Sequence, residues 1–212
     1  MDTMTQKMAD APKEKTDAQL IEDFKAGSTA AMEEIVSRYE NSIFTFGLKM
    51  CGQIQDAEDI VQETFLNAFR YLDGFRQETK LKNWLFKIAS SACIKKRRKK
   101  KCEPDRELSL DAFPVDGVHT TYQIPDWSND PSDAFMRGEM KQIMDEAIQA
   151  LPHKNKLVFN LRDIEGFNTK ETADILDISV ESVKTRLHRA RRFLREKIAK
   201  AYKEREPDDG SI

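Results

Sequence analysis

Apolar residues recur at steps of three and four through most of the first hundred positions, which is the period of one face of an α-helix. The longest such pattern follows Ser28, a residue type that favours helix N-caps, and it stops before Gly52. Asp17 is predicted to cap a shorter helix ahead of it, which ends at Gly27. The long pattern is made by Met32, Ile35, Val36, Tyr39, Ile43, Phe46 and Met50.

The same spacing continues after Gly52 and predicts two more helices with short connections. The third helix is expected to bury Ala57, Ile60, Val61, Phe65, Ala68, Phe69 and Leu72. In all, four helices are predicted, over residues 18–26, 29–51, 55–72 and 81–101. Four helices with short loops form a compact bundle of about 85 residues.

The helical period is lost across residues 103–131, which contain four prolines and are predicted to be a linker. Trp127 is predicted to be its large apolar anchor, through either local packing or a partner contact. Helical patterns resume near Ser132 and include one that Gly166 breaks. A short helix, a tight turn and a longer basic helix then follow, which is the spacing of a helix-turn-helix. Asn168 or Thr169 is expected to cap the short helix, and Ser179 the long one.

These patterns predict an all-α protein, with a four-helix bundle and a helix-turn-helix domain joined by a flexible linker. The predicted boundaries are a disordered tail over 1–16, the bundle over 17–101, the linker over 102–131, the helix-turn-helix domain over 132–202 and a tail over 203–212.

Charge alternates strongly along a chain whose total is only −2. The net charge is +9 over residues 81–101 and +5 over 152–202, whereas residues 102–151 carry −8. Two separate basic zones indicate two contacts with a polyanion, and the acidic stretches limit indiscriminate binding. No run approaches the ~18 apolar residues of a membrane span, and the first residues lack the apolar core of a secretory signal, so a cytoplasmic location is expected.

The last helix has two distinct faces. Val180, Val183, Leu187, Ala190 and Leu194 form an apolar stripe that should pack on the preceding helices. The opposite face collects Glu181, Lys184, Thr185, His188, Arg192 and Arg195, with Arg189 on its flank. Lysine and arginine read guanine edges in the major groove and neutralise phosphates, so this face is predicted to bind DNA rather than to be a solvated surface.

Catalytic and metal chemistry find little support in the sequence. It contains no glycine-rich phosphate loop, no H-E-x-x-H and no nucleophile motif, so neither an enzyme, a cofactor nor a small-molecule substrate is expected. Cys51, Cys93 and Cys102 are too few and too scattered for a zinc site, and no metal is expected. Cys51 and Cys93 are predicted to pack in hydrophobic cores. Cys102 directly follows a run of lysine and arginine residues, which could lower the pKa of its thiol, so a redox role stays open.

Two segments resemble one bacterial family. DAEDIVQETF, with the later LKNWLFKIA, resembles region 2 of the extracytoplasmic-function (ECF) sigma factors of RNA polymerase. ALPHKNKLVFNLRDIEGFNTKETADILDISVESVKTRLHRARRFLRE resembles their region 4. The resemblance covers about residues 17–100 and 133–200. It implies an alternative sigma factor that binds core RNA polymerase and directs initiation at particular promoters.

The resemblance also implies roles for residues of the first domain. Its third helix would dock on the clamp helices of the largest polymerase subunit through Asp56, Asp59, Gln62 and Glu63. The turn and fourth helix would hold a flipped base of the −10 element near Phe75, Lys80, Lys82, Asn83 and Trp84, although core packing is the more expected role of Trp84. Ser91 stands where the family often has asparagine and offers fewer hydrogen bonds to a base edge, so the captured base is not identified.

For the second domain, the resemblance implies that the last helix reads the −35 element. Base contacts would come from Lys184, Thr185, His188 and Arg189, and phosphate contacts from Arg186 and Arg192. The linker is expected to run toward the RNA exit channel. The expected partners are core RNA polymerase, promoter DNA and an anti-sigma factor.

Other functions remain open from the residues alone. A helix-turn-helix regulator that is not a sigma factor would explain residues 152–200 but not the bundle. The run KKRRKKK over 95–101 could be a nuclear address or only aid solubility. Its place at the end of the fourth helix favours phosphate binding near the −10 element without base specificity, through Lys95, Lys96, Arg97, Arg98 and the lysines that follow.

Overall fold

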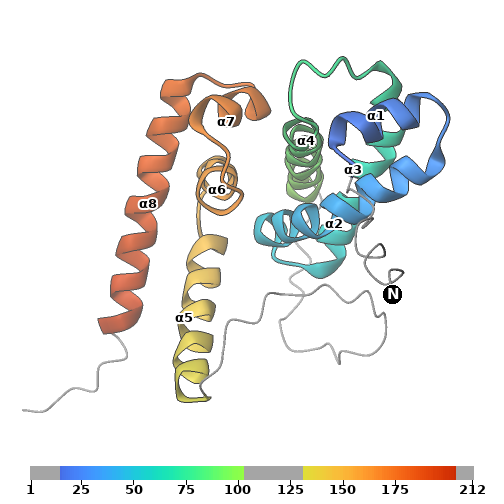
Figure 1. The fold of residues 1–212 in the computed structure, drawn as a ribbon. Helices are drawn as coiled ribbons and strands as arrows, with labels where there is room; N and C mark the ends of the chain where they lie inside the picture. The colour runs from blue at the N-terminus through green and yellow to red at the C-terminus, as the bar shows by residue number, and fades with distance from the viewer. Residues whose placement is uncertain (1–14, 103–130, 204–212) are drawn as a thin grey trace, which may run out of the picture.

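The computed structural model describes residues 15–102 and 131–203, and every regular element in these stretches is helical (Figure 1). The predicted terminal tails and most of the predicted linker, with Trp127, lie outside the described residues. Within the described stretches, no helix combines the length and the apolar character needed to cross a lipid bilayer.

The first domain is the predicted four-helix bundle. Its elements are α1 (Asp17–Lys25), α2 (Thr29–Cys51), α3 (Ile54–Tyr71), the 3₁₀ turn η1 (Leu72–Gly74) and α4 (Leu81–Cys102). Phe46 and Phe86 are fully buried and meet edge to face, with 5.4 Å between ring centroids. Of the two cysteines predicted to pack in cores, Cys93 is buried in this core and Cys51 packs against it. The apolar stripes predicted for α2 and α3 contribute to this core together with residues of α1 and α4.

Two details of the bundle differ from the prediction. Thr16, not Asp17, caps α1: its hydroxyl accepts from the Gln19 backbone N–H, and Gln19 Oε1 accepts from the Thr16 N–H. Asp17 is wrong as the cap, because its carboxylate instead accepts from Arg38 at 2.8 Å and from Tyr39 at 2.5 Å. Phe69 was predicted to be buried but is 54% exposed, and its ring meets that of Phe24 edge to face.

The second domain contains the predicted helix-turn-helix. Its elements are α5 (Pro131–Gln149), α6 (His153–Phe159), a π-helical turn η2 (Asn160–Ile164), α7 (Thr169–Leu176) and α8 (Val180–Lys203). Asn168 caps α7 through a reciprocal pair of bonds with Glu171, and Ser179 Oγ accepts from the third residue of α8. The α8 stripe is buried at Val183 and Leu187 and further along the helix. Figure 1 shows α5 and α8 side by side.

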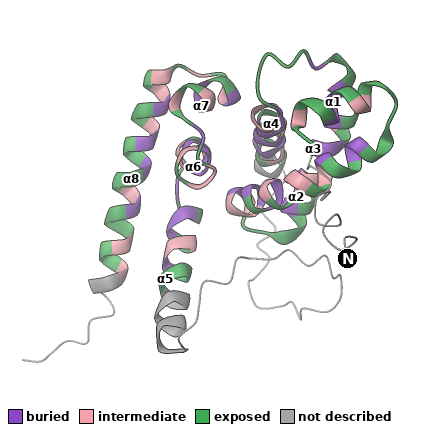
Figure 2. Cartoon of the chain, in the orientation of Figure 1, coloured by how far each residue is buried: buried purple, intermediate pink, exposed green. Residues whose placement is uncertain are grey.

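The two domains pack on each other and share one hydrophobic core. Leu157, Leu161, Phe167 and Ile175 of the second domain belong to the same buried cluster as α2, α3 and α4. Figure 2 shows buried residues on α4 and α6, which lie at the centre of the molecule. The sequence predicted two domains on a linker, and nothing in its patterns indicated this contact.

Candidate nucleic-acid interface

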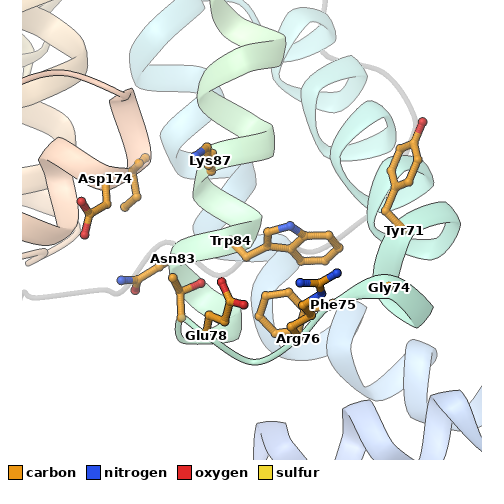
Figure 3. Close-up of a pocket in the computed structure, with 11 residues that line it drawn as sticks. Tyr71, Gly74, Phe75, Arg76, Glu78, Asn83, Trp84, Lys87 and Asp174 are labelled. Carbon is orange, nitrogen blue, oxygen red and sulfur yellow. The ribbon is translucent and has the colours of Figure 1, made fainter.

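The loop between α3 and α4 forms one wall of a pocket of about 600 Å³ (Figure 3). The loop is fastened to α1, because Lys25 Nζ donates to the Phe75 carbonyl at 2.8 Å and Gln77 Nε2 donates to Glu22 at 2.9 Å. Gln77 has a positive φ of 56°, which turns the chain back toward α4. The pocket is lined by Tyr71, Gly74, Phe75, Arg76, Glu78, Thr79, Asn83, Trp84, Lys87, Asp174 and Ile175.

Aromatic rings give this pocket a flat wall. Trp84 is half-buried and its ring centroid lies 4.9 Å from that of Phe75, with 34° between the planes (Figure 3). Phe75 is buried beneath it, so it supports Trp84 rather than facing solvent. Tyr71 stands across the pocket and is 63% exposed. Aromatic faces of this kind suit an unstacked base, because every base can stack on them.

A second, smaller pocket of about 370 Å³ adjoins the first one. Tyr71, Trp84 and Lys87 line both pockets, and Ser91 lines only the second. The Ser91 hydroxyl donates to the Lys87 carbonyl at 2.9 Å, so its side chain is turned back onto its own helix.

Three further residues predicted for the −10 element, Lys80, Lys82 and Asn83, contact the second domain. Lys80 Nζ lies 3.1 Å from a carboxylate oxygen of Glu171, and Asn83 also hydrogen-bonds that carboxylate. Lys82 Nζ donates to the Glu165 carbonyl at 3.1 Å and lies 3.9 Å from its carboxylate. Burial raises the pKa of Glu165 to about 7, even though Lys82 and Lys49 favour its charged form. Lys80 and Asn83 are therefore paired with a carboxylate of the same chain, and Lys82 is bonded to a backbone carbonyl.

The acidic side of α3 is paired with the start of the cationic run. Asp56 is only 7% exposed and lies 3.0 Å from Lys96 Nζ, which also contacts Asp59. Burial lowers the pKa of Lys96, but its bonds to Asp59 and Asp56 outweigh this and the pKa is raised overall. Glu63 pairs with Lys95 at 3.0 Å. Gln62 and Glu63 line a pocket of about 540 Å³ beside exposed Leu66, whereas Arg97 and Arg98 are exposed.

The basic face of α8 lies on the solvent side of the second domain. Lys184, Thr185, His188 and Arg189 are all exposed, and they lie opposite the buried stripe as predicted. Arg186 is half-buried, and Arg192 is exposed with Glu196 3.7 Å away on the same helix. The capped α7 and the turn after it fix the direction in which α8 starts.

The sequence reasoning missed several residues of the pocket. Tyr71 and Lys87 fall outside the apolar stripes of their helices, and the family motif did not single them out. Tyr71 could have been predicted as a pocket residue, because it is an aromatic residue outside the buried stripe and close to the DGF turn. Within residues 15–102 and 131–203, no cluster of three His, Cys, Asp or Glu side chains suits a metal ion.

Comparison with known proteins agrees with this arrangement. The family described as Sigma-70 region 2 matches residues 35–102, and the family described as Sigma-70, region 4 matches residues 141–194. The ECF RNA polymerase sigma factor SigW of Bacillus subtilis (strain 168) is 34% identical over 178 residues, which is 84% of this chain and 94% of SigW. This chain belongs to the ECF sigma factors.

Other proteins are similar to this ECF sigma factor in sequence or in fold. The ECF RNA polymerase sigma-E factor of Haemophilus influenzae is 31% identical, over 86% of this chain and 95% of that protein. Two solved structures share the fold. CnrH in complex with the cytosolic domain of CnrY has a TM-score of 0.58 at 21% identity, covering 86% of this chain and 97% of CnrH. The sigma factor RpoE in complex with the anti-sigma factor NepR from Bartonella quintana has a TM-score of 0.59 at 20% identity, covering 79% of this chain and 96% of RpoE.

Proposed function

We propose that this alternative sigma factor, which directs transcription initiation, reads promoters with two surfaces on separate domains. The observation that carries the proposal is the exposed basic face of α8. This helix belongs to a helix-turn-helix whose first helix, α7, is capped by Asn168. In the proposal α8 lies in the major groove of the −35 element. Lys184, Thr185, His188 and Arg189 contact base edges, and Arg186 and Arg192 contact phosphates.

The −10 element is assigned to the bundle. The pocket of about 600 Å³ is lined by Tyr71 and Trp84, and its aromatic walls support capture of a flipped nucleotide of the non-template strand. Lys80, Lys82 and Asn83 would contact the same strand. Ser91 would border the second pocket, and its hydroxyl must leave the Lys87 carbonyl before it can bond a base edge.

Core RNA polymerase is assigned to the polar side of α3. Gln62 is exposed and Glu63 is half-buried, and Leu66, further along the same helix, is 50% exposed. A surface that combines polar and apolar side chains in this way supports docking of a protein partner. Asp59 joins this surface, while buried Asp56 would act by holding Lys96 in place. An anti-sigma factor is a further proposed partner, since both solved relatives named above were determined with one or with its cytosolic domain.

The test is transcription by purified core RNA polymerase, with and without this protein, on fragments of bacterial genomic DNA. Sequencing the 5′ ends of the transcripts should give a set of start sites that share one −35 and one −10 sequence. A chain that binds DNA but leaves the start sites of core enzyme unchanged would instead be a helix-turn-helix regulator, and the proposal would be wrong.

A further inference from the structure

Two of the three cysteines of the chain meet inside the first domain, where α2 packs on α4. Cys51 is the last residue of α2, and Cys93 lies within α4. Their side chains are hydrogen-bonded to each other. Core packing explains why each residue is shielded from solvent, but it does not require a thiol at both positions.

The packing of α2 on α4 holds the two thiols together. Phe46 of α2 meets Phe86 of α4 edge to face, with 5.4 Å between ring centroids. Cys93 follows Phe86 by about two helical turns, so these side chains share one face of α4. Cys51 follows Phe46 along α2, and both helices therefore carry a cysteine beyond the aromatic contact. Thiols that are already in contact meet the first geometric requirement of a disulfide.

The two thiols differ in access and in their charged neighbours. Cys93 is 2% exposed, and the hydrogen bond to Cys51 together with burial raises its pKa well above the ordinary value. Cys51 is half-buried, so a small reagent reaches it first. Burial lowers the pKa of Lys156 to about 8, which leaves most of this amine charged at pH 7, and its charge interacts with Cys51. A neighbouring cation favours the thiolate, which is the nucleophilic form of cysteine.

We propose that Cys51 and Cys93 form an oxidation site, at which a low-molecular-weight disulfide converts the two thiols into a disulfide bond between α2 and α4. The Cys51 thiolate attacks one sulfur of the small disulfide, which forms a mixed disulfide and releases one small thiolate. Cys93 gives its proton to a released thiolate and attacks the Cys51 sulfur, and the second small thiolate leaves. The two protein thiols lose two electrons in total, and the small disulfide is reduced to two thiols.

The bond fastens the helix that carries the candidate −10 pocket. The first turns of α4 line this pocket through Trp84 and Lys87. The last turn of α2 binds the second domain, because Gln149 Nε2 donates to the Leu48 and Lys49 carbonyls at 3.3 and 2.9 Å. A bond between the two helices fixes α4 on α2 under oxidising conditions, and it restricts the unfolded chain, which stabilises the bundle. The site does not depend on which surfaces bind the promoter.

The experiment incubates the full, reduced chain with oxidised glutathione, quenches exchange with acid and maps disulfides by mass spectrometry of unreduced peptides. The wild type should lose two of its three thiols, and one peptide pair should join Cys51 to Cys93. C102S is the matched control, because it removes the third cysteine and should form the same bond. In C51S/C102S the Cys93 thiol should stay free. In C93A/C102S oxidation should stop at a mixed disulfide of Cys51 with glutathione. Circular dichroism shows whether each variant is folded.

Thermal unfolding of C102S before and after oxidation gives a second readout. The oxidised protein should unfold at a temperature about 5–15 °C higher than the reduced protein, and dithiothreitol should restore the original value. The same treatment should leave the unfolding temperature of C51S/C102S unchanged.

Several results would overturn the inference. One is a wild type that keeps all its thiols, or that joins Cys102 to either of the other cysteines in place of this pair. Another is a mixed disulfide of Cys51 that persists in C102S, because Cys93 would then not reach Cys51. A lower unfolding temperature of oxidised C102S would mean that the bond forms only after the bundle opens. Each of these results leaves promoter-specific transcription with core enzyme intact, since that function has its own test.

Discussion

Lys95 and Lys96 are neighbours in the cationic run, yet their side chains lie in different surroundings. The Lys95 side chain is 78% exposed and meets Glu63 at the surface. The Lys96 side chain is only 21% exposed and pairs with Asp56, whose carboxylate is almost buried. The sequence alone does not distinguish the two lysines, because a run of consecutive cations has no periodic pattern from which the buried face of a helix can be predicted.

This difference gives a prediction for stability. K96A should lower the free energy of unfolding by about 1–3 kcal/mol, because it leaves Asp56 buried without its cation. K95A, which removes the same charge from an exposed pair, should change it by less than about 0.5 kcal/mol. Denaturant unfolding followed by circular dichroism measures both values. Equal losses in the two variants would mean that Asp56 does not depend on Lys96.

A second prediction at the residue scale concerns the bases read by α8. Replacing Lys184 or Arg189 with alanine should relax the −35 preference, costing about 1–3 kcal/mol for each base contact that the variant cannot make. Binding to a duplex library in which one −35 position is varied at a time measures the preference. K141A removes one exposed cation from α5 and should leave the preference unchanged. If K184A and R189A also leave it unchanged, another face of the domain reads the DNA.

Helices and their ends were largely predictable, because apolar spacing and capping residues act over a few positions. The stripes of α2 and α8 came directly from the sequence, which also limited the cap of α7 to Asn168 or Thr169. The errors at Asp17 and Phe69 have a physical origin: Thr16 was the better cap one residue earlier, and a small bundle cannot bury every apolar side chain of α3. The pairing of Lys80 with Glu171 joins residues 91 positions apart, and no local pattern encodes it.

The cap of α7 allows a test at the scale of the element. N168A should cost about 0.5–2 kcal/mol of unfolding free energy, because it removes the oxygen that accepts from the Glu171 N–H at 2.9 Å. Ser28 also occupies an N-cap position, but its side chain makes no cap bond, so S28A should cost much less. Thermal unfolding of the two variants makes the comparison. A loss in S28A as large as that in N168A would contradict the role given to the capping bond.

The end of α4 gives a further prediction for the cationic run. Arg97 and Arg98 are exposed, and we propose that they contact phosphates near the −10 element. R97A/R98A should make the dependence of log affinity on log salt shallower, by up to about 0.7–0.9 for each phosphate that is no longer neutralised. The order of preference among promoter sequences should stay the same, since phosphate contacts carry no base information. An unchanged salt slope would favour a role in solubility alone.

At the scale of the whole molecule, the contact between the domains should depend on pH through Glu165. Packing raises its pKa from an ordinary value near 4.5 to about 7, so the packed state binds a proton more tightly than the separated state does. The contribution of Glu165 to packing is therefore most favourable below about pH 4.5, weakens as the pH rises toward 7, and changes little above that. His153, whose pKa is lowered to about 4 by burial and by Arg97 of α4, acts in the opposite sense between about pH 4 and 6.5.

Comparing the wild type with E165Q isolates the contribution of Glu165, because His153 is present in both proteins. Small-angle X-ray scattering at about pH 5 and pH 7.5 measures how far the domains are apart. The radius of gyration of the wild type should increase with pH relative to that of E165Q, since only the wild type has to desolvate a carboxylate when the domains close. Parallel pH profiles would mean that Glu165 is equally solvated in the packed and separated states. The contact between the domains would then depend on Phe167 and Glu171 without any contribution from the charge on Glu165.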